Sequence, residues 1–388
     1  MGEALIFKMR RTDMRVLMTG GGTGGHVNPA LAIAEIIKAN EPDSEIAFVG
    51  TARGLENTLV PKAGYKLYHI DIQGIKRSLS LSNVKTAYLI VTSQFEARKI
   101  IKEFKPDIVI GTGAYVCWPL LRAAAAMNIP TMIHESNAIA GFAVKQLKNK
   151  VDVIMTNFES TAKSLGCRAK VMQVGNPISL DFGRYTKAEA RKLAGIPEDA
   201  GTVVLSLGGS LGAHRINEAM LKVMLELTSK KPSVMHFHAC GKSDLGYAQK
   251  CFAEYGLEGK SNLVLSEYIY NMPIMMAAAD IVICRAGAMT LSEVAAMRKA
   301  AIIVPSPNVT EDHQYKNAKQ LADADAAIVI RESELTDKLM IETIDALIKH
   351  PARREKMAEN ISAFATDDVR QRIYKEICDL LKKDRKSK

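Results

Sequence analysis

Short apolar runs rich in β-branched residues alternate with longer amphipathic stretches along this chain. The runs in its first part cover residues 16–19, 46–49, 108–110, 131–133 and 153–155. Strands that alternate with helices pair side by side in one direction, so this pattern predicts parallel sheets with helices on both faces. The sequence therefore predicts the α/β fold class.

Gly and Pro interrupt the pattern around residues 171–185, and a second series of apolar runs follows. These runs cover residues 203–207, 234–239, 263–265, 281–284, 301–304 and 326–330. The second series begins "VVLSLGGSLGAHRIN", and the first begins "VLMTGGGTGGHVNP", so both open with a strand, a glycine-rich turn and a helix start. We therefore predict two doubly wound, Rossmann-like domains. Their strand ends would face a shared cleft, where open parallel sheets bind ligands.

The length of the chain also favours two domains, because 388 residues exceed what one hydrophobic core usually supports. We expect the first domain to cover residues 1–178 and the second to cover residues 179–364. Two helical stretches follow Pro351. We expect the last of them, within residues 365–388, to pack back onto the first domain and complete it.

Charge and cysteine content narrow the partners and the compartment. The 52 basic and 42 acidic residues give a formal net charge of +10, which favours an anionic partner: nucleic acid, a phosphorylated metabolite or a membrane surface. The six cysteines are scattered without a CxxC pair, which indicates reduced, structural thiols and no metal site. No apolar run approaches the roughly 20 residues of a spanning helix, and no signal peptide is evident. We expect a cytoplasmic protein, at most peripheral on a membrane.

Four glycine-rich turns, each after a predicted strand, carry the candidate chemistry. They cover residues 20–26, 111–119, 208–214 and 284–293. The turns that open the two domains lack the lysine of a Walker loop, which disfavours an NTPase. A dinucleotide fingerprint fits loosely over the first turn, but Gly50 stands where its acidic residue belongs, which disfavours an oxidoreductase. Such turns bind anions through helix-start N–H groups, or they only let a strand and a helix pack closely.

Seven motifs, in this order, resemble the MurG family of UDP-N-acetylglucosamine:lipid I N-acetylglucosaminyltransferases. They are "GGTGGHVNPALAIAE", "KPDIVIGTGAYV", "HESNAIAG", "VGNP", "GGSLGA", "CRAGAMTLSE" and "DHQYKNA". The resemblance implies an inverting glycosyltransferase of the GT-B fold, which moves GlcNAc from UDP-GlcNAc to the C4 hydroxyl of MurNAc in lipid I. The product would be lipid II for peptidoglycan synthesis, and hence for cell shape and division.

The resemblance also implies where the ligands bind. The nucleotide would lie in the second domain, and the first would face the acceptor and the cytoplasmic side of the cell membrane. No metal or other cofactor is required at the transfer step, and no nucleic acid is bound. Other wall-synthesis proteins are possible partners.

The resemblance assigns donor contacts in the second domain. It implies that Glu293 binds the ribose hydroxyls, although "TLSE" also fits a capping box that would leave the carboxylate a structural role. The same loop supplies further contacts at Ala288, Met289, Thr290, Leu291 and Ser292. Ser210 would contact the diphosphate, although it could also be a helix N-cap.

Three more residues are assigned to the donor by the resemblance. The backbone at Ile269 would recognise uracil, whereas the sequence alone predicts a core side chain there. Gln314 would contact the sugar hydroxyls, although a Gln at a helix start is more often an ordinary surface residue. Asn137 would reach the sugar from the opposite domain.

His26 is the candidate base. An inverting transfer needs a group that takes the proton of the acceptor hydroxyl, and a histidine with an ordinary pKa near ~6.5 suits neutral pH. A lone loop histidine is more often only a polar surface residue. With Thr23, Gly24 and Gly25 lining the cleft beside it, we interpret this turn as an acceptor-side anion cradle.

A membrane-facing surface is expected between Lys76 and Lys105, where seven basic and two acidic residues occur. Apolar side chains are interleaved at Ile75, Leu79, Leu81, Tyr88 and Phe95, and Trp118 lies on another loop. Basic and apolar side chains together favour an anionic membrane surface. The alternative is an amphipathic helix with a solvated face.

Two positions depart from the family pattern. Ser179 stands where an arginine near the donor phosphates is common, with Arg184 close in sequence, and Leu211 replaces the glutamine of "GGSQGA". The rival interpretations are a GT-B transferase acting on diacylglycerol or another lipid, a UDP-GlcNAc epimerase, and a non-catalytic sugar-nucleotide or membrane-bound scaffold that would not need His26.

Overall fold

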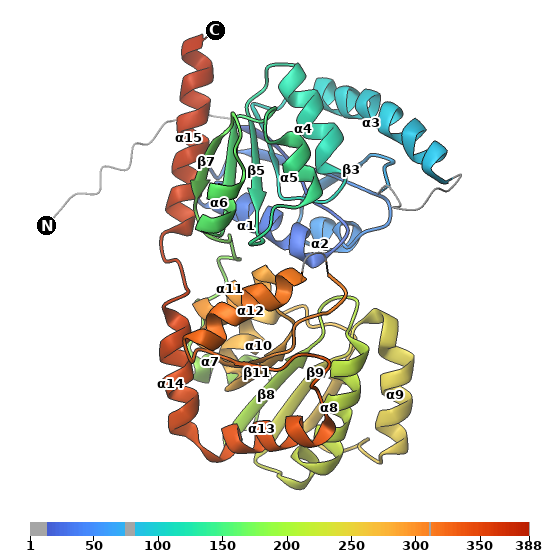
Figure 1. Cartoon of the computed structure of the whole chain (residues 1–388), viewed down its shortest axis with the longest axis vertical. Helices are drawn as coiled ribbons and strands as arrows, with labels where there is room; N and C mark the ends of the chain where they lie inside the picture. Colours follow the sequence, from blue (N-terminus) through green and yellow to red (C-terminus); the bar gives the residue numbers. More distant parts are fainter. Residues whose placement is uncertain (1–13, 74–81, 310–311, 388) are drawn as a thin grey trace, which may run out of the picture.

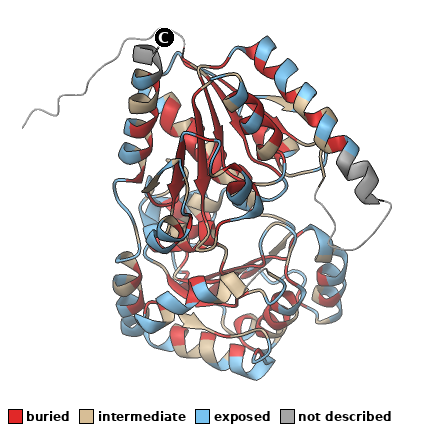
Figure 2. Cartoon of the chain, turned by 45° about the horizontal axis from the view of Figure 1, so that its top comes forward, coloured by how far each residue is buried: buried red, intermediate tan, exposed pale blue. Residues whose placement is uncertain are grey.

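Two parallel sheets, each covered by helices on both faces, lie one above the other in Figure 1. The computed structural model describes residues 14–73, 82–309 and 312–387. Figure 2 shows that the central strands of both sheets are buried, whereas the helices keep exposed outer faces. The predicted fold class, two Rossmann-like α/β domains, is therefore confirmed.

The described part of the first domain holds a seven-stranded sheet in the order β3-β2-β1-β4-β5-β6-β7. Its strands are β1 (Arg15–Thr19), β2 (Glu45–Gly50), β3 (Lys66–His69), β4 (Ile108–Gly111), β5 (Thr131–Glu135), β6 (Val153–Thr156) and β7 (Lys170–Gln173). Its helices are α1 (Gly24–Asn40), α2 (Glu56–Lys62), α3 (Ser82–Phe104), α4 (Cys117–Ala126), α5 (Phe142–Leu147) and α6 (Glu159–Ser164). The order reverses at β1, which pairs with both β2 and β4.

The described part of the second domain repeats this plan with a six-stranded sheet in the order β10-β9-β8-β11-β12-β13. Its strands are β8 (Thr202–Leu207), β9 (Val234–Ala239), β10 (Leu263–Ser266), β11 (Ile281–Cys284), β12 (Ala300–Ile303) and β13 (Ile328–Val329). Its helices are α7 (Lys187–Leu193), α8 (His214–Glu226), α9 (Leu245–Glu254), α10 (Met272–Ala278), α11 (Ala288–Ala296), α12 (His313–Asp323), α13 (Asp337–Lys349) and α14 (Pro351–Ser362), with short 3-10 turns at η1 (Thr228–Lys230) and η2 (Lys242–Asp244).

Every predicted strand is confirmed, but two edge strands were not predicted. β3 (KLYH) and β7 (KVMQ) border the first sheet, and each is exposed at its ends and only partly buried between them. A strand at an edge needs fewer apolar residues than a central strand, so it leaves a weaker hydrophobic signal.

The last helix, α15 (Val369–Ser387), lies against the first domain although it follows the second in sequence. Its apolar residues Val369, Ile373, Ile377 and Leu381 recur every four positions, so they form one stripe. This stripe shares a hydrophobic cluster with α1 and with one face of the first sheet. The first core is therefore completed by the last helix of the chain.

Two histidines are buried inside the second sheet. His236 and His238 lie on β9, and the hydroxyl oxygen of Ser206 lies 2.9 Å from a ring nitrogen of each. Burial lowers the pKa of His236 to about 3 and that of His238 to about 4. Both rings are therefore neutral in the fold at physiological pH.

These rings predict acid sensitivity. The unfolded chain binds a proton at each histidine below a pKa of 6.5, whereas the folded chain does not until about pH 4, so stability falls as the pH drops from 6.5 towards 4. We expect a loss of about 2 kcal/mol per ring at pH 5, measured by chemical denaturation at pH 8, 6.5 and 5. The variant His236→Asn should have a shallower pH slope. The variant His69→Gln, at an exposed position, should keep the wild-type slope; equal slopes in all three proteins would contradict this account.

Candidate functional site

The two domains meet at the carboxyl ends of their strands, and we call this region the interdomain junction. The Asn176 side-chain amide, just after β7, donates to the Ala288 carbonyl (3.2 Å) and the Ser292 hydroxyl (3.0 Å) of α11. The Ser136 hydroxyl, just after β5, lies 3.7 Å from the Met289 sulfur. Helices α1 and α11 are also in contact. The junction therefore brings together the segments that follow β1, β5, β7 and β11.

His26 lies in the first turn of α1, where its ring orientation is fixed. Its Nδ1 lies 2.9 Å from the Thr112 carbonyl oxygen, and the Thr112 hydroxyl donates to the His26 carbonyl oxygen at 2.6 Å. A carbonyl oxygen can only accept, so the neutral ring carries its proton on Nδ1 and keeps a lone pair on Nε2. Any side chain at Gly113 would collide with the ring. This arrangement suits a proton acceptor.

Three helices begin at the junction without a side-chain cap: α1, α8 and α11. Uncapped N–H groups at a helix start can bind an anion, and the helix dipole favours negative charge there. The N-cap of α8 is Ala213, so the interpretation of Ser210 as an N-cap is wrong. Ser210 lies in the turn before the helix and is partly exposed.

The capping-box interpretation of Glu293 is also wrong. Helix α11 begins at Ala288 with Gly287 as its N-cap, so Thr290 lies inside the first turn and is not the cap. Glu293 is only partly exposed, and burial raises its pKa to about 8. Burying an ionisable group costs free energy, so a helix cap does not account for this carboxyl group.

The Ile269 loop lies close to Glu293. Burial raises the pKa of Tyr268, and the charge of Glu293 raises it further, as expected for neighbouring groups. Ile269 itself is buried in the core, as the sequence predicts, which leaves its backbone as the part able to recognise a ligand. Across the junction, the Lys62 ammonium group lies 4.0 Å from the centre of the Tyr270 ring.

Gln314 and Asn137 approach the junction from different domains. Gln314 lies in the first turn of α12, which packs against α11, and its side-chain oxygen accepts from the Ser306 N–H at 2.9 Å. It is therefore more than a surface residue. Asn137 is held by buried Glu135, whose Oε1 accepts from the Asn137 backbone N–H (2.9 Å) and side-chain amide (3.1 Å). The other Glu135 oxygen accepts from the Gly141 N–H at 2.6 Å.

Arg184, which is close in sequence to position 179, is paired with a neighbouring carboxylate. It is exposed and pairs with Asp181 at 3.0 Å, and its guanidinium group stacks near Tyr185. The Ser179 carbonyl accepts from Arg370 (3.3 Å), which belongs to α15.

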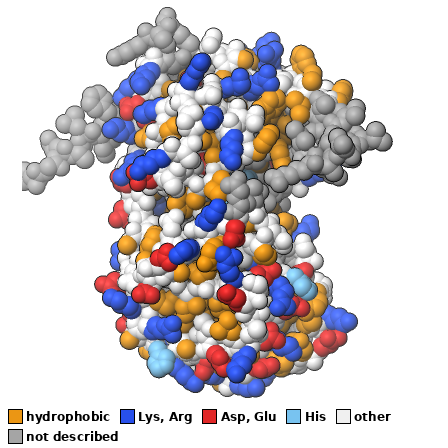
Figure 3. Space-filling view, viewed as in Figure 1, with side chains coloured by type: hydrophobic (Ala, Val, Ile, Leu, Met, Phe, Trp, Pro, Cys, Tyr) orange, Lys and Arg blue, Asp and Glu red, His pale blue; other side chains and the backbone are white. Residues whose placement is uncertain are grey.

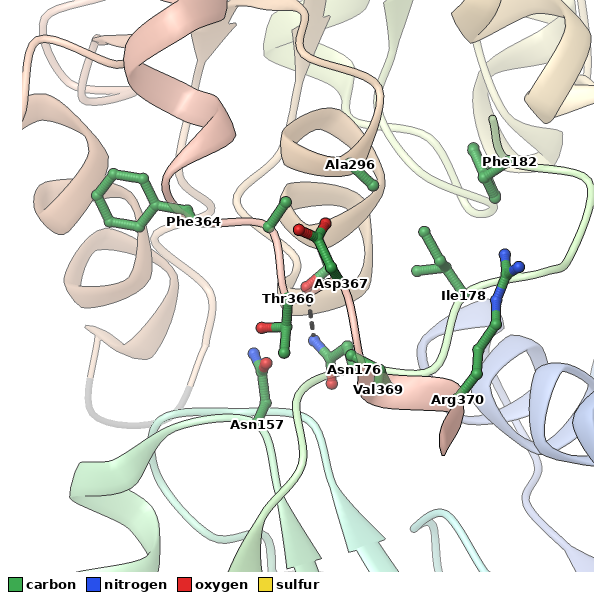
Figure 4. A pocket seen from close by; sticks show the side chains of 12 residues that line it. Asn157, Asn176, Ile178, Phe182, Ala296, Phe364, Thr366, Asp367, Val369 and Arg370 are labelled. Carbon is green, nitrogen blue, oxygen red and sulfur yellow. Dashed lines mark hydrogen bonds between the residues drawn. The ribbon is translucent and has the colours of Figure 1, made fainter. Parts of the chain in front are cut away.

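Arg370 lines a cavity of about 230 Å³ between the two segments that connect the domains, shown in Figure 4. Asn176 and Ser292, whose side chains are hydrogen-bonded, line the same cavity. Figure 4 labels Asn176 and draws this bond as a dashed line from its side chain. The cavity therefore borders the segments that connect the domains, and it lies next to the face of α11 to which Asn176 is hydrogen-bonded.

The sequence did not single out two buried groups that shape the site. Glu135 holds the loop of Asn137, and its position at the carboxyl end of β5, before a glycine-containing turn, is the signal that points to it. His134 is fully buried with Nε2 2.8 Å from the Gly175 carbonyl oxygen, and burial lowers its pKa to about 4. The contact with Gly175 bridges 41 residues of sequence, so no local pattern reveals it.

Comparisons with known proteins match both halves of the chain. Residues 16–156 match the glycosyltransferase family 28 N-terminal domain, and residues 203–373 match the family 28 C-terminal domain. The chain is 40% identical, over 95% of its length and 99% of the relative's, to the UDP-N-acetylglucosamine–N-acetylmuramyl-(pentapeptide) pyrophosphoryl-undecaprenol N-acetylglucosamine transferase of Acetivibrio thermocellus.

Solved structures agree in fold. The crystal structure of Acinetobacter baumannii MurG has 31% sequence identity and a TM-score of 0.67, and the match covers 95% of this chain and 99% of that one. UDP-GlcNAc 2-epimerase from Neisseria meningitidis, bound to UDP-GlcNAc, has 17% identity and a TM-score of 0.64 over 94% of this chain and all of that one. At this identity the second likeness concerns the fold alone.

The raised pKa of Glu293 predicts that removing its charge stabilises the ligand-free protein. The unfolded carboxyl ionises above 4.5 and the folded one only near 8, so stability is complete below pH 4.5 and is lost as the pH rises towards 8. We expect Glu293→Gln to raise stability at pH 7.5 by about 4 kcal/mol and Tm by roughly 10 °C, measured by calorimetry. At pH 4.5 the variant and wild type should melt together; a variant less stable at both pH values would show that the carboxyl group supports the fold.

Proposed function

The chain belongs to glycosyltransferase family 28, within its MurG branch, and from this membership we propose how the interdomain junction works. The enzyme transfers GlcNAc from UDP-GlcNAc to the C4 hydroxyl of MurNAc in lipid I, which gives lipid II and UDP. The observation that carries the assignment of the reaction centre is the contact between α1, which bears His26, and α11, which bears Glu293.

His26 takes the proton of the acceptor hydroxyl. The Nδ1 bond to Thr112 keeps Nε2 free, so this nitrogen accepts the proton as the hydroxyl oxygen attacks the anomeric carbon. The bond from that carbon to the β-phosphate oxygen breaks on the opposite face, which inverts the configuration. UDP leaves with the bonding electrons.

The second domain holds the donor. Glu293 accepts hydrogen bonds from the ribose hydroxyls, the backbone at Ile269 binds uracil, and Ser210 contacts the diphosphate. The N–H groups at the start of α8 stabilise the charge that builds up on the leaving diphosphate, and no metal ion is required for this. Residues Ala288 to Ser292 line the nucleotide, and Gln314 and Asn137 contact the sugar.

The first domain holds the acceptor. Thr23, Gly24 and Gly25 form the start of α1, beside His26, where the helix dipole favours the anionic diphosphate of lipid I. Ser179 occupies the position of the expected arginine, and Arg184 is paired with Asp181, so neither is the main phosphate contact. The comparisons do not favour a diacylglycerol acceptor, and the likeness to an epimerase does not extend beyond the fold.

A membrane-facing surface on α3 supports the lipid acceptor. Tyr88, Val91 and Phe95 expose 67%, 57% and 66% of their surface and recur at helical spacing, so they form one apolar stripe. Exposed Arg98 and Lys102 continue the same face. Figure 3 shows hydrophobic side chains together with Lys and Arg over this helix, at the upper right. We infer that this face, the α3 stripe, binds the surface of an anionic membrane.

Part of the expected membrane surface falls on residues that the structure does not describe. Residues Ile75, Lys76, Arg77, Leu79 and Leu81 are outside the described residues. None of the helices in the described part of the chain is both long enough and apolar enough to cross a bilayer.

The transfer reaction predicts different kinetic effects for the two key residues. His26→Ala should lower kcat by at least a hundredfold with little change in the KM for UDP-GlcNAc, because it removes the base and leaves the donor site intact. Glu293→Gln should raise that KM at least tenfold, because the amide offers one acceptor oxygen where the carboxyl group has two for the ribose hydroxyls. The measurement follows radiolabelled GlcNAc from UDP-GlcNAc into a lipid I analogue.

Two controls make this assay decisive. Diacylglycerol offered in place of the lipid I analogue should receive no label, and label in diacylglycerol would reassign the acceptor. A His26→Ala variant with wild-type kcat would remove His26 from the role of base, and an unchanged donor KM in Glu293→Gln would remove Glu293 from the donor site.

The α3 stripe predicts two separable contributions to membrane binding. Replacing Val91 and Phe95 by Ser should weaken binding to phosphatidylglycerol vesicles roughly tenfold in sedimentation assays, because apolar burial is lost. Arg98→Gln with Lys102→Gln should weaken binding by a similar factor at low salt, and only on anionic vesicles. The control Leu193→Ser removes an equally exposed apolar side chain (58%) from the second domain and should have no effect. Equal binding of all variants would contradict the proposal that the α3 stripe binds the membrane.

A further inference from the structure

A carboxyl group is buried directly behind the first glycine-rich turn, and the reaction described above does not use it. Glu56, the first residue of α2, has no exposed surface. Its Oε2 accepts from the Gly22 N–H at 2.8 Å, and its Oε1 accepts from the Thr51 N–H and the Thr51 hydroxyl, both at 2.9 Å. All three partners are donors, so the two carboxylate oxygens bridge the loops that follow β1 and β2.

The glycines around Glu56 leave it room. A β-carbon at Gly21 would lie 2.7 Å from its Oε1, and one at Gly50 would lie 2.6 Å from its Cγ. A β-carbon at Gly54 would also collide with the carboxylate. Gly50, where a dinucleotide-binding protein would carry its acidic residue, is therefore a glycine because the side chain of Glu56 occupies that space. The acidic group at this place is the side chain of Glu56 from α2, and it binds the glycine-rich turn at Gly22.

The turn that Glu56 binds is followed directly by the start of α1, which carries the proposed base His26. Gly22 has a φ of +82° and its carbonyl accepts from the Leu55 N–H at 3.2 Å, so both backbone groups of this residue are tied to the segment that starts α2. Thr23, the next residue, is the N-cap of α1, and its carbonyl accepts from the N–H groups of His26 and Val27, both at 3.1 Å. A shift of Gly22 therefore moves the start of α1 and, with it, the His26 ring.

We propose that Glu56 is a positioning residue of the transfer reaction: its carboxylate fixes the glycine-rich turn so that His26 and the start of α1 face the acceptor. The proposal rests on the proposed role of His26. The proposal also reduces the number of N–H groups that can bind an anion at this turn. The Gly22 N–H already donates to a carboxylate and therefore does not bind a phosphate. The acceptor diphosphate is therefore bound by the N–H groups after Gly22, at Gly24 and Gly25.

The isosteric variant Glu56→Gln separates the two arms of this bridge. A glutamine amide has a single oxygen, and keeping it towards the two donors of Thr51 turns its NH₂ group towards the Gly22 N–H. Two donors then face each other, so the turn is released while the side-chain volume is unchanged. We expect kcat to fall roughly ten- to hundredfold, because small misplacements of a reacting group cost rates of this size. The KM for UDP-GlcNAc should stay within about twofold, since the donor binds in the other domain.

A matched control removes a hydrogen bond from the other carboxylate oxygen. Thr51→Val deletes the hydroxyl that donates to Oε1 but leaves the Gly22 bond intact. It should lower stability about as much as Glu56→Gln does and leave kcat near the wild-type value. Hydrogen exchange measured by mass spectrometry should be faster for the peptide covering residues 19–27 in Glu56→Gln and unchanged in Thr51→Val.

A double-mutant cycle tests whether Glu56 acts through His26. In the His26→Ala background, Glu56→Gln should change the residual rate by less than about twofold. The same fold-loss in both backgrounds, or a wild-type kcat in Glu56→Gln, would overturn the proposal. If Glu56→Gln does not fold, Glu56→Asp, which is one methylene too short to bridge both loops, is measured in the same way with the same expected and contrary results. Loss of the proposed function itself would appear separately, as wild-type protein without transferase activity.

Discussion

The start of each helix at the interdomain junction leaves backbone N–H groups that no helical carbonyl can satisfy, and in the first domain α1 begins without a side-chain cap. Buried carboxylates of the first domain hold loops that lie before helices: Glu56 binds the loops after β1 and β2, and Glu135 binds the loop after β5. In the second domain, α8 and α11 begin without a side-chain cap. These uncapped starts agree with an anionic nucleotide in the second domain and an anionic acceptor at α1, and the buried carboxylates agree with first-domain loops that are held in place before the acceptor arrives.

Rigid loops matter because inversion requires two reactants held by separate domains to meet in one geometry. Asn176 ties the end of the first sheet to α11, and Lys62 contacts Tyr270 across the junction. The cavity in Figure 4 lies among the segments that connect the domains, beside the same Asn176 side chain. These contacts between the described parts of the two domains involve polar or charged groups, which is typical of interfaces that permit movement around a bound substrate.

Much of the fold was predictable because central parallel strands are buried on both faces and read as continuous apolar runs. The edge strands β3 and β7 escaped prediction because their end residues are exposed and the residues between them are only partly buried, so neither forms a continuous apolar run. The capping-box pattern at Thr290 misled, since a short pattern does not reveal that α11 already starts at Ala288. Glu56 contacts Gly22 across 34 residues, so its role depends on the folded loops and leaves no local pattern.

The return of α15 to the first domain constrains how the protein is made. A ribosome releases the chain from the amino terminus onward, and domains generally fold in that order. Here one face of α1 and of the first sheet is covered by the stripe from Val369 to Leu381, which is synthesised after the second domain. During translation the first domain must therefore keep an apolar surface uncovered while the whole second domain emerges. Its core is complete only after α15 has been synthesised.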